Sequence, residues 1–422
     1  MQVENKKLLL LIIGVAILFP LFLLLSGDIY NSVVPIVDSL GDFSRLPLPI
    51  SILACFGGIL MLIGDYRRAL LALTLLGAML FVMLVSLIFA GVDMEIGRRK
   101  VILLLQFLLP VFGLVLGQQI IDRDRVIPHA FLYVLFLVVP MQLVSGWLQG
   151  NLTLTHYLYL FSIYSHFQYV PLIFVCAFAY SMTNLWESHK KAFYILMPLM
   201  FIYAVASVSF LTIFAYFSFI IVFAYSKQNP IKNNKAMIMV TALIVATVAG
   251  LNMHYWHIKY HSAAAGIDSS KYLNKFEVLA SGKIPINVEE RLDIWSLYIS
   301  GVTESGRTVL LGHIAPLPRE VKSSAHNWYL DMAYNFGLIS MLPMLLLIGY
   351  TAYLLWQSRE TLPRETLWLA IIVFYLVVVD NNFKVTLRQP YPGIFAYFLW
   401  GLLLSRLTSN RIENGGRILV HP

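Results

Sequence analysis

The chain has 422 residues, of which 59% are hydrophobic and only 12% are charged. Soluble proteins carry about a quarter charged residues, so this composition excludes a soluble globular protein and predicts an all-α, polytopic membrane protein. The net charge of +8 fits cytoplasmic loops beside anionic lipid, and without a basic block interleaved with aromatic residues it argues against a nucleic-acid partner.

The N-terminal 27 residues have a basic start followed by an apolar run of about 19 residues, close to the length that spans a bilayer. No small-residue cleavage site follows this run, so we interpret it as a retained first helix and not as a signal peptide. Cys55 and Cys176 both fall in apolar segments, which does not indicate a disulfide framework.

Twelve apolar segments have the length and composition expected of membrane-spanning helices, although several are shorter than the ~20 residues that a perpendicular helix needs. They cover residues 8–26, 47–64, 69–91, 101–121, 127–146, 169–186, 192–207, 209–226, 236–253, 337–356, 367–379 and 393–405. The seventh and eighth segments are nearly continuous, and we divide them at Ser207–Phe210. This division sets the orientation of every later helix.

Basic residues in the short loops predict the orientation. With a cytoplasmic N-terminus, most of these residues lie on the cytoplasmic side of a bacterial inner membrane, and both termini are cytoplasmic. Three outward groups break the rule: Arg98-Arg99-Lys100, Lys384 and Arg388. They are either accidents of topology or an anion site on the outer face.

This orientation divides the chain into three parts. Residues 1–253 hold helices 1–9, residues 254–328 form one long periplasmic loop, and residues 329–422 hold helices 10–12 with a cytoplasmic tail. A long polar loop that delivers a histidine to the membrane surface is typical of an active site, so we predict that the loop is catalytic.

The first of two helices predicted in the loop starts at Asn287, where Glu290 follows three residues later as in a capping box. Gly301 and Gly306 signal its end. The apolar stripe of this helix comprises Leu292, Trp295, Ile299 and Val302. Arg291 lies beside the stripe; it either holds a phosphate with two guanidinium nitrogens or pairs with a neighbouring carboxylate or a lipid headgroup.

The second loop helix is predicted to start at Ser323 or Ser324, both favourable N-cap residues. His326 and Asn327 then lie in its first turn, where free backbone N–H groups and the helix dipole favour an anion and keep the histidine neutral. A neutral His326 can accept a proton. Alternatively, His326 and Trp328 are amphipathic rings resting at the membrane interface.

Several motifs are missing from the sequence. It has no G-x-x-x-x-G-K-[ST], no G-x-S-x-G, and in the outward loops no H-E-x-x-H, paired cysteines or D-x-D. We therefore predict no ATP-binding domain, no metal and no cofactor. A reaction that fits uses an activated donor that is already in the membrane, namely a polyprenyl-pyrophosphate sugar. Transfer from this donor needs a base for the acceptor hydroxyl and cations for the leaving group.

The sequence has Arg291-Leu-Asp-Ile-Trp295, Leu311-Gly312, and His326-Asn327 followed after nine residues by Gly337 and then by Ser340. A later run reads Arg388-Gln-Pro-Tyr-Pro-Gly393. In these runs, residues 287–405 resemble the O-antigen ligase/polymerase family of bacterial membrane glycosyltransferases. The resemblance implies twelve helices, a large periplasmic loop before the tenth, and an inverting, metal-independent transfer.

The resemblance also implies roles for residues and partners. Arg291 would contact pyrophosphate and act in catalysis with His326, the base or a phosphate contact. Further pyrophosphate contacts would be Asn327, Arg98, Arg99 and Arg388. The partners would be an undecaprenyl-pyrophosphate-linked glycan, membrane lipid, and chain-length regulator and flippase proteins. The turn Ser207–Thr212 lacks the arginine that many relatives have there, and Arg98 or Arg99 would then replace it.

Three functions follow. The first is a polymerase, which moves a growing glycan from undecaprenyl pyrophosphate onto another lipid-linked repeat unit. The second is a ligase, which moves the finished glycan onto lipid A core by the same chemistry. The third is a flippase or exporter of lipid-linked glycans. A flippase predicts charged or polar stripes through several helices, and no coherent charged path is present in the sequence.

Overall fold

The computed structural model describes residues 3–23, 48–89, 94–148, 169–207, 209–227, 286–317 and 324–418. Helices make up almost all of this part of the chain. The sheet found there is one antiparallel pair of two-residue strands, β1 (Phe22–Leu23) and β2 (Leu48–Pro49). The predicted all-α class is therefore confirmed.

The chain folds as two units, residues 1–130 with 294–422, and residues 131–293. Helices α6 (Val126–Leu148) and α11 (Ile286–Val302) run across the boundaries between them. The second unit further contains α7 (Val170–Ala206) and α8 (Phe210–Lys227). The other elements of the first unit are α1 (Val3–Leu18), α2 (Ile50–Met61), η3 (Ile63–Ala69), α3 (Leu70–Phe89), α4 (Met94–Leu108), α5 (Val111–Gln119), α12 (Gly306–Leu311), α13 (Trp328–Phe336), η4 (Leu338–Met341), α14 (Leu342–Gln357), α15 (Arg364–Phe374), the π-helical η5 (Tyr375–Val379), η6 (Asp380–Asn382), η7 (Thr386–Arg388) and α16 (Pro390–Ile418).

Within the described residues, six helical stretches are long and apolar enough to cross a membrane. They are Tyr66–Phe89, Lys100–Gln119, Val126–Ser145, Val170–Ala206, Leu338–Gln357 and Arg364–Asn382, and two shorter apolar helices cover Ile50–Met61 and Leu211–Ala224. A polytopic membrane protein is therefore compatible with the structure, while the count of twelve spans stays a prediction. The predicted span 236–253 lies outside the described residues.

Helix α7 folds back on itself. Its backbone leaves the helical region at His189 (φ −129°, ψ 32°), and the ring centroids of Phe174 and Tyr203 lie 5.7 Å apart. In a straight helix, 29 residues would separate them by about 43 Å. The limbs before and after the kink match the predicted segments 169–186 and 192–207. Since α7 ends at Ala206 and α8 begins at Phe210, the predicted division there is also confirmed.

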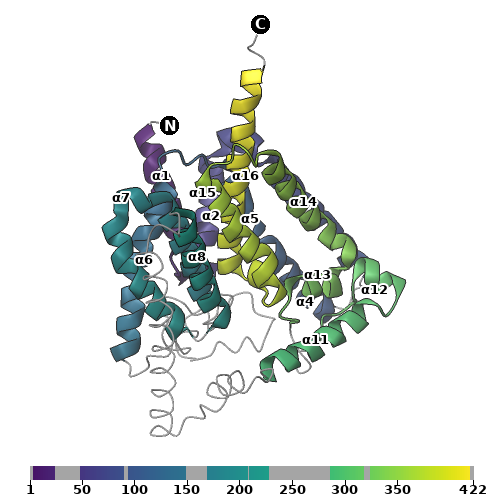
Figure 1. Cartoon of the computed structure of the whole chain (residues 1–422). Coiled ribbons are helices and arrows are strands. Elements are labelled where there is room, and N and C mark those ends of the chain that lie inside the picture. The colour runs from purple at the N-terminus through teal and green to yellow at the C-terminus, as the bar shows by residue number, and fades with distance from the viewer. Residues whose placement is uncertain are drawn as a thin grey trace, which may run out of the picture. The chain divides into compact units, whose positions relative to one another are not determined.

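Helices α5 and α16 cross in direct backbone contact and form the centre of the first unit (Figure 1). A Cβ on Gly113 would lie 2.4 Å from the carbonyl oxygen of Ile394, and one on Gly117 would lie 2.2 Å from that of Phe398. On the other helix, a Cβ on Gly401 would lie 2.4 Å from the carbonyl oxygen of Leu114. Small residues four apart are the usual means of close helix packing in membranes.

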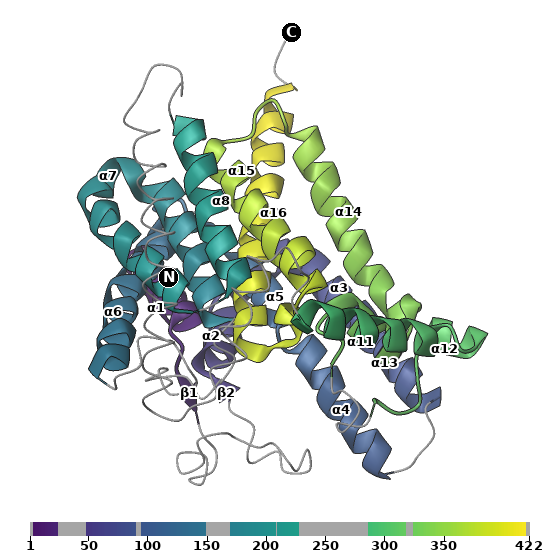
Figure 2. The same ribbon diagram turned by 60° about the horizontal axis from the view of Figure 1, so that its bottom comes forward.

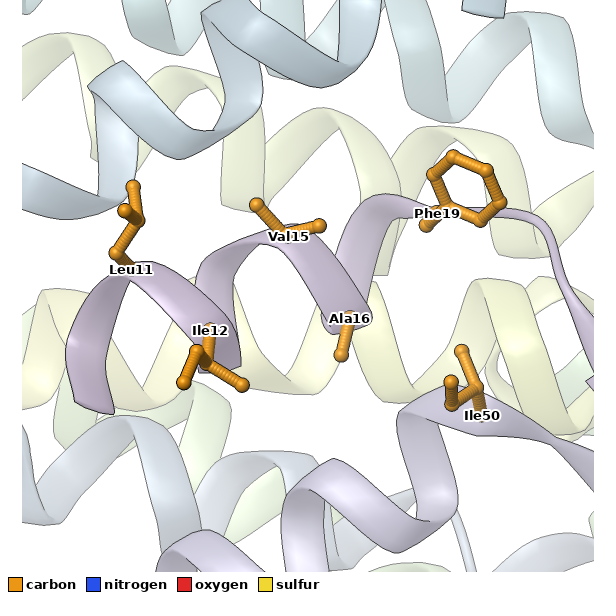
Figure 3. A pocket seen from close by; sticks show the side chains of 6 residues that line it. All are labelled: Leu11, Ile12, Val15, Ala16, Phe19 and Ile50. Carbon is orange, nitrogen blue, oxygen red and sulfur yellow. The ribbon is translucent and has the colours of Figure 1, made fainter. Parts of the chain in front are cut away.

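An open hollow of about 440 Å³ lies along α1. Its lining is Leu11, Ile12, Val15, Ala16, Phe19 and Ile50 (Figure 3). These side chains are all apolar, so the hollow offers no group for acid, base or anion chemistry. A site for such chemistry is therefore expected among the polar residues.

Candidate functional site

Helices α11, α12 and α13 come together beside one end of α14 (Figure 2). The phenol rings of Tyr298 in α11 and Tyr334 in α13 pack with centroids 4.9 Å apart. The indole N–H of Trp295 donates a 2.9 Å hydrogen bond to the carbonyl oxygen of Ala325. Helix α11 is therefore attached to the residue immediately before His326.

The buried face of α11 differs from the predicted stripe. Ile294, Tyr298 and Val302 are buried, whereas Leu292 and Ile299 are 52% and 49% exposed. Apolar residues occur all round this helix, so their spacing does not identify the buried side. The start at Ile286 agrees with the predicted start at Asn287.

The predicted stop signals of α11 have different roles. The helix ends at Val302, which confirms an end beside Gly301. Gly306, however, begins the next helix. Ser305 is the N-cap of α12, and its side chain accepts a hydrogen bond from the backbone N–H of Thr308. Gly306 is therefore a start and not a stop.

The start of α13 corrects a second prediction. The N-cap is Asn327, whose Oδ1 accepts hydrogen bonds from the backbone N–H groups of Tyr329 (3.0 Å) and Leu330 (3.2 Å). Ser324 is not the cap, and Ser323 lies outside the described residues. His326 therefore precedes the helix and does not lie in its first turn. The predicted effect of the first helical turn on this imidazole is therefore wrong.

His326 has an uncommon backbone conformation, with φ at +50°. Few non-glycine residues adopt positive φ, although histidine is among those that do so more often, and such residues are enriched at functional sites. The imidazole is half-buried. The backbone N–H of His326 donates to Ser324 Oγ at 3.1 Å.

Asp331, one turn into α13, fixes this conformation. Its carboxyl group is fully buried and accepts hydrogen bonds from Ser324 Oγ (2.8 Å) and from the backbone N–H of Ala325 (2.7 Å). Ser324 Oγ in turn accepts from His326, so one carboxylate determines the course of the chain through His326. Asp331 was not among the predicted site residues, because from sequence it is one acidic residue in an apolar helix.

Arg388, 57 residues after Asp331 in the sequence, completes the network. Its Nη1 lies 2.7 Å from Asp331 Oδ2, and the residue is 9% exposed. Burial raises the pKa of Asp331, while Arg388, the Ala325 N–H and the Ser324 hydroxyl act to lower it. Arg388, predicted as a pyrophosphate contact, therefore pairs with a carboxylate in this structure.

The segment that carries Arg388 has its own buried ion pair. Lys384 Nζ lies 3.6 Å from Asp380 Oδ1, and Thr386 Oγ1 donates to the other oxygen of that carboxyl group. Asn381 Oδ1 accepts from the backbone N–H of Leu387 at 3.0 Å. These contacts make the loop before α16 a rigid support. Lys384, an exception to the charge rule, is thus neutralised by Asp380.

Two glycines of the resemblance have a packing role. Gly312 (φ +78°) ends α12 and Gly337 (φ +79°) ends α13, where the two backbones touch. A Cβ on Gly337 would lie 2.1 Å from the carbonyl oxygen of Leu310, and His313 donates from its backbone N–H to Tyr334 at 2.8 Å. The spacing from Asn327 to Gly337 is therefore the length of α13, from N-cap to C-cap.

Three of the six predicted site residues lie in or next to the Asp331 network: His326, Asn327 and Arg388. Arg291 is half-buried and lies in the first turns of α11, four residues before Trp295. Arg98 and Arg99 belong to α4, and their side chains lie outside the part of the structure that is described. Their predicted pyrophosphate contacts stay predictions.

Comparison with known proteins adds no relative: the sequence matches no protein-family model and no curated protein.

Proposed function

We propose that this protein is a membrane glycosyltransferase of the O-antigen ligase/polymerase type, acting as a surface-polysaccharide polymerase. The observation that carries the proposal is the support of His326. Asn327 caps the helix that follows His326, Asp331 holds the loop that precedes it, and Arg388, from the segment before α16, pairs with Asp331. So many buried polar contacts around one half-buried imidazole are expected where its position affects chemistry.

In the proposed reaction, His326 accepts the proton of an acceptor sugar hydroxyl. The hydroxyl oxygen attacks the anomeric carbon of the donor glycan and forms the new glycosidic bond. The bond from that carbon to the pyrophosphate oxygen breaks, and undecaprenyl pyrophosphate leaves with the electron pair. Attack opposite the leaving group inverts the anomeric centre. Arg291 stabilises the negative charge that grows on the pyrophosphate.

A ligase is the alternative, since it uses the same donor and the same chemistry with lipid A core as the acceptor. The spacing of His326-Asn327 from Gly337 resembles the ligase pattern, whereas the missing arginine in the turn Ser207–Thr212 favours the polymerase. The acceptor distinguishes the two functions, and it is read directly from the glycan that a mutant cell makes.

The test is a silver-stained gel of lipopolysaccharide from a strain lacking the gene. One repeat unit on the core without a ladder indicates a polymerase. Bare core with long glycan on the lipid carrier indicates a ligase. An unchanged ladder, with unchanged capsule and exopolysaccharide, contradicts both functions.

Complementation then tests the base. The His326→Ala variant should reach the membrane in normal amount and restore no transfer, because the acceptor hydroxyl keeps its proton. His129→Ala is the matched control, since His129 lies in α6 and bonds the carbonyl oxygen of Arg125. If the His326→Ala variant restores glycan transfer, this histidine is not the base of the mechanism.

A further inference from the structure

Lys100 in α4 has an unusual environment. The residue is 1% exposed, and among the described residues its Nζ has no hydrogen-bond partner. The ammonium lies 5.6 Å from the centroid of the Phe336 ring. Among the described residues, Arg307, also a cation, acts on this ammonium electrostatically. A buried positive charge thus faces an aromatic ring and a like charge.

This environment is unfavourable unless an anion joins it. An ammonium taken out of water loses its hydration, and a ring face replaces only a small part of that loss. Ionisable residues at membrane spans are rare and usually serve function. Lys100 begins one of the candidate spans, Lys100–Gln119.

A second, independent observation concerns two neighbouring donors. Trp328 Nε1 and Arg388 Nε are buried, and within the described residues neither has a hydrogen-bond partner. Both side chains lie near the Phe107 ring. The centroids of the Trp328 and Phe107 rings lie 5.6 Å apart, and Arg388 Cζ lies 6.0 Å from the Phe107 centroid. The Phe107 ring also contacts that of Phe336, at 5.8 Å.

Among the described residues, three unpaired donors lie around the Phe107 and Phe336 rings, Lys100 Nζ, Trp328 Nε1 and Arg388 Nε, and one unpaired acceptor, Asn335 Oδ1, belongs to the residue before Phe336. The carboxylate that reaches this cluster, Asp331, already accepts hydrogen bonds from Ser324, Ala325 and Arg388. Buried polar groups in proteins are normally paired, so three unpaired donors against one unpaired amide oxygen indicate a missing acceptor. With positive charge nearby, that acceptor is an anion.

We propose that Lys100 is the counter-charge for a phosphate group that binds beside Phe107 and Phe336, with Trp328 Nε1 and Arg388 Nε as further donors. The proposal rests on the proposed function in one respect: the phosphate that function supplies is the donor's diphosphate. The headgroup of an anionic phospholipid has the same chemistry. Arg307 is exposed and donates from Nη2 to the carbonyl oxygen of Phe89, which extends the positive charge to the surface.

The test compares the melting temperature of purified full-length variants in discs of zwitterionic lipid. Without added anion, Lys100→Met should melt higher than wild type, because an apolar chain of similar length replaces an uncompensated buried charge. Inorganic pyrophosphate should raise the melting temperature of wild type. In Lys100→Met its affinity should fall at least tenfold, and Lys100→Arg should retain it.

Lys190→Met is the matched control. It removes the same unit of charge from a side chain that is 51% exposed and paired with Glu187, so pyrophosphate should bind it as it binds wild type. Equal pyrophosphate affinity in wild type and Lys100→Met would overturn the proposal. So would a lower melting temperature for Lys100→Met without anion, because Lys100 would then stabilise the fold.

A second arm identifies the source of the phosphate. Discs containing phosphatidylglycerol replace the pyrophosphate; if only this lipid gives a stabilisation that depends on Lys100, the ligand is a headgroup. If neither probe gives a stabilisation that depends on Lys100, the proposal is overturned. These measurements need no transfer activity. Binding through Lys100 in a protein whose deletion leaves every surface glycan unchanged would refute the proposed function and retain the site.

Discussion

Asp331 shows how a single buried carboxylate can determine a site. It holds two residues of the loop before α13 and one arginine from the segment before α16. A carboxylate in such a position stabilises the fold only while its cation remains. The stability of the network therefore depends on each partner, and the position of the His326 imidazole depends on the network.

We expect Asp331→Ala to destabilise the protein by about 3–5 kcal/mol, because Arg388 loses its partner while still buried. The measurement is the melting temperature in detergent. Glu187→Ala is the control: its ion pair with Lys190 is exposed, and its loss should leave the melting temperature unchanged.

The double variant Asp331→Leu with Arg388→Met separates stability from function. Replacing both partners of a buried pair by apolar residues is often neutral for stability. We expect the double variant to recover stability but not transfer, since nothing then holds Ser324 and Ala325. Recovery of transfer would show that the network serves the fold alone.

The sequence singled out His326, Asn327 and Arg388, and the predictions that failed here have physical causes. Ser323, Ser324 and Asn327 are all good N-cap residues, and propensity does not choose among them. The choice is tertiary, because the Asp331 carboxylate occupies Ser324 and leaves Asn327 to cap. Arg388 was placed in an outward loop, yet its partner lies 57 residues away and no local pattern reports it.

At the scale of elements, the contact between the ends of α12 and α13 restricts most strongly which residues the chain can carry. Both helices end in a glycine with positive φ, and each glycine meets the backbone of the other element. This fixes the C-terminus of α13 as firmly as Asn327 fixes its N-terminus. The polar loop thus leads into a helix that is held at both ends, and His326 lies immediately before its N-cap.

Gly337→Ala should therefore cost at least ~1–3 kcal/mol, since alanine at φ +79° is strained and its Cβ would meet the Leu310 carbonyl oxygen. Gly349→Ala is the control: within the described residues, nothing lies within 4 Å of a Cβ added there in the middle of α14. Alanine in a helix interior is favoured over glycine by about 1 kcal/mol, so this variant should melt no lower than wild type. Equal melting temperatures of the two variants would refute the role of the contact between α12 and α13.

The α7 hairpin was predicted at this scale because the charged and polar run from Glu187 to Lys191 separates two apolar segments. The stripe of α11 was wrong for the opposite reason. That helix has apolar residues on all sides, and only the packing of Tyr298 on Tyr334 identifies its inner face. Sequence periodicity is informative where polar residues gather on one outer face, and in α11 they are spread around the helix.

At the scale of the whole molecule, the orientation in the membrane is the main open prediction. We expect Glu304→Cys to react with an impermeant maleimide in intact spheroplasts, and Glu360→Cys to react only after lysis. Both glutamates are well exposed, at 68% and 84% of the side chain. Cys55 and Cys176 are buried and should give no background labelling.

Labelling of Glu360→Cys in intact spheroplasts would invert the topology and place His326 in the cytoplasm. A lipid-linked donor on the outer face would then be out of reach, and the proposed function would fail with the orientation. Equal labelling of both variants before lysis would instead mean that the cells were not intact, which a cytoplasmic marker protein detects.

The crossing of α5 and α16 also has a consequence in time. Residues 120–389 are translated between the two helices, which takes on the order of half a minute at 5–20 residues per second. Throughout that interval the glycine face of α5 has no partner, because the helix that covers it has not been made. The centre of the unit therefore closes after the ribosome has passed α16. During synthesis α5 can pack against α2, η3 and α3, which are made before it, while its glycine face waits for α16.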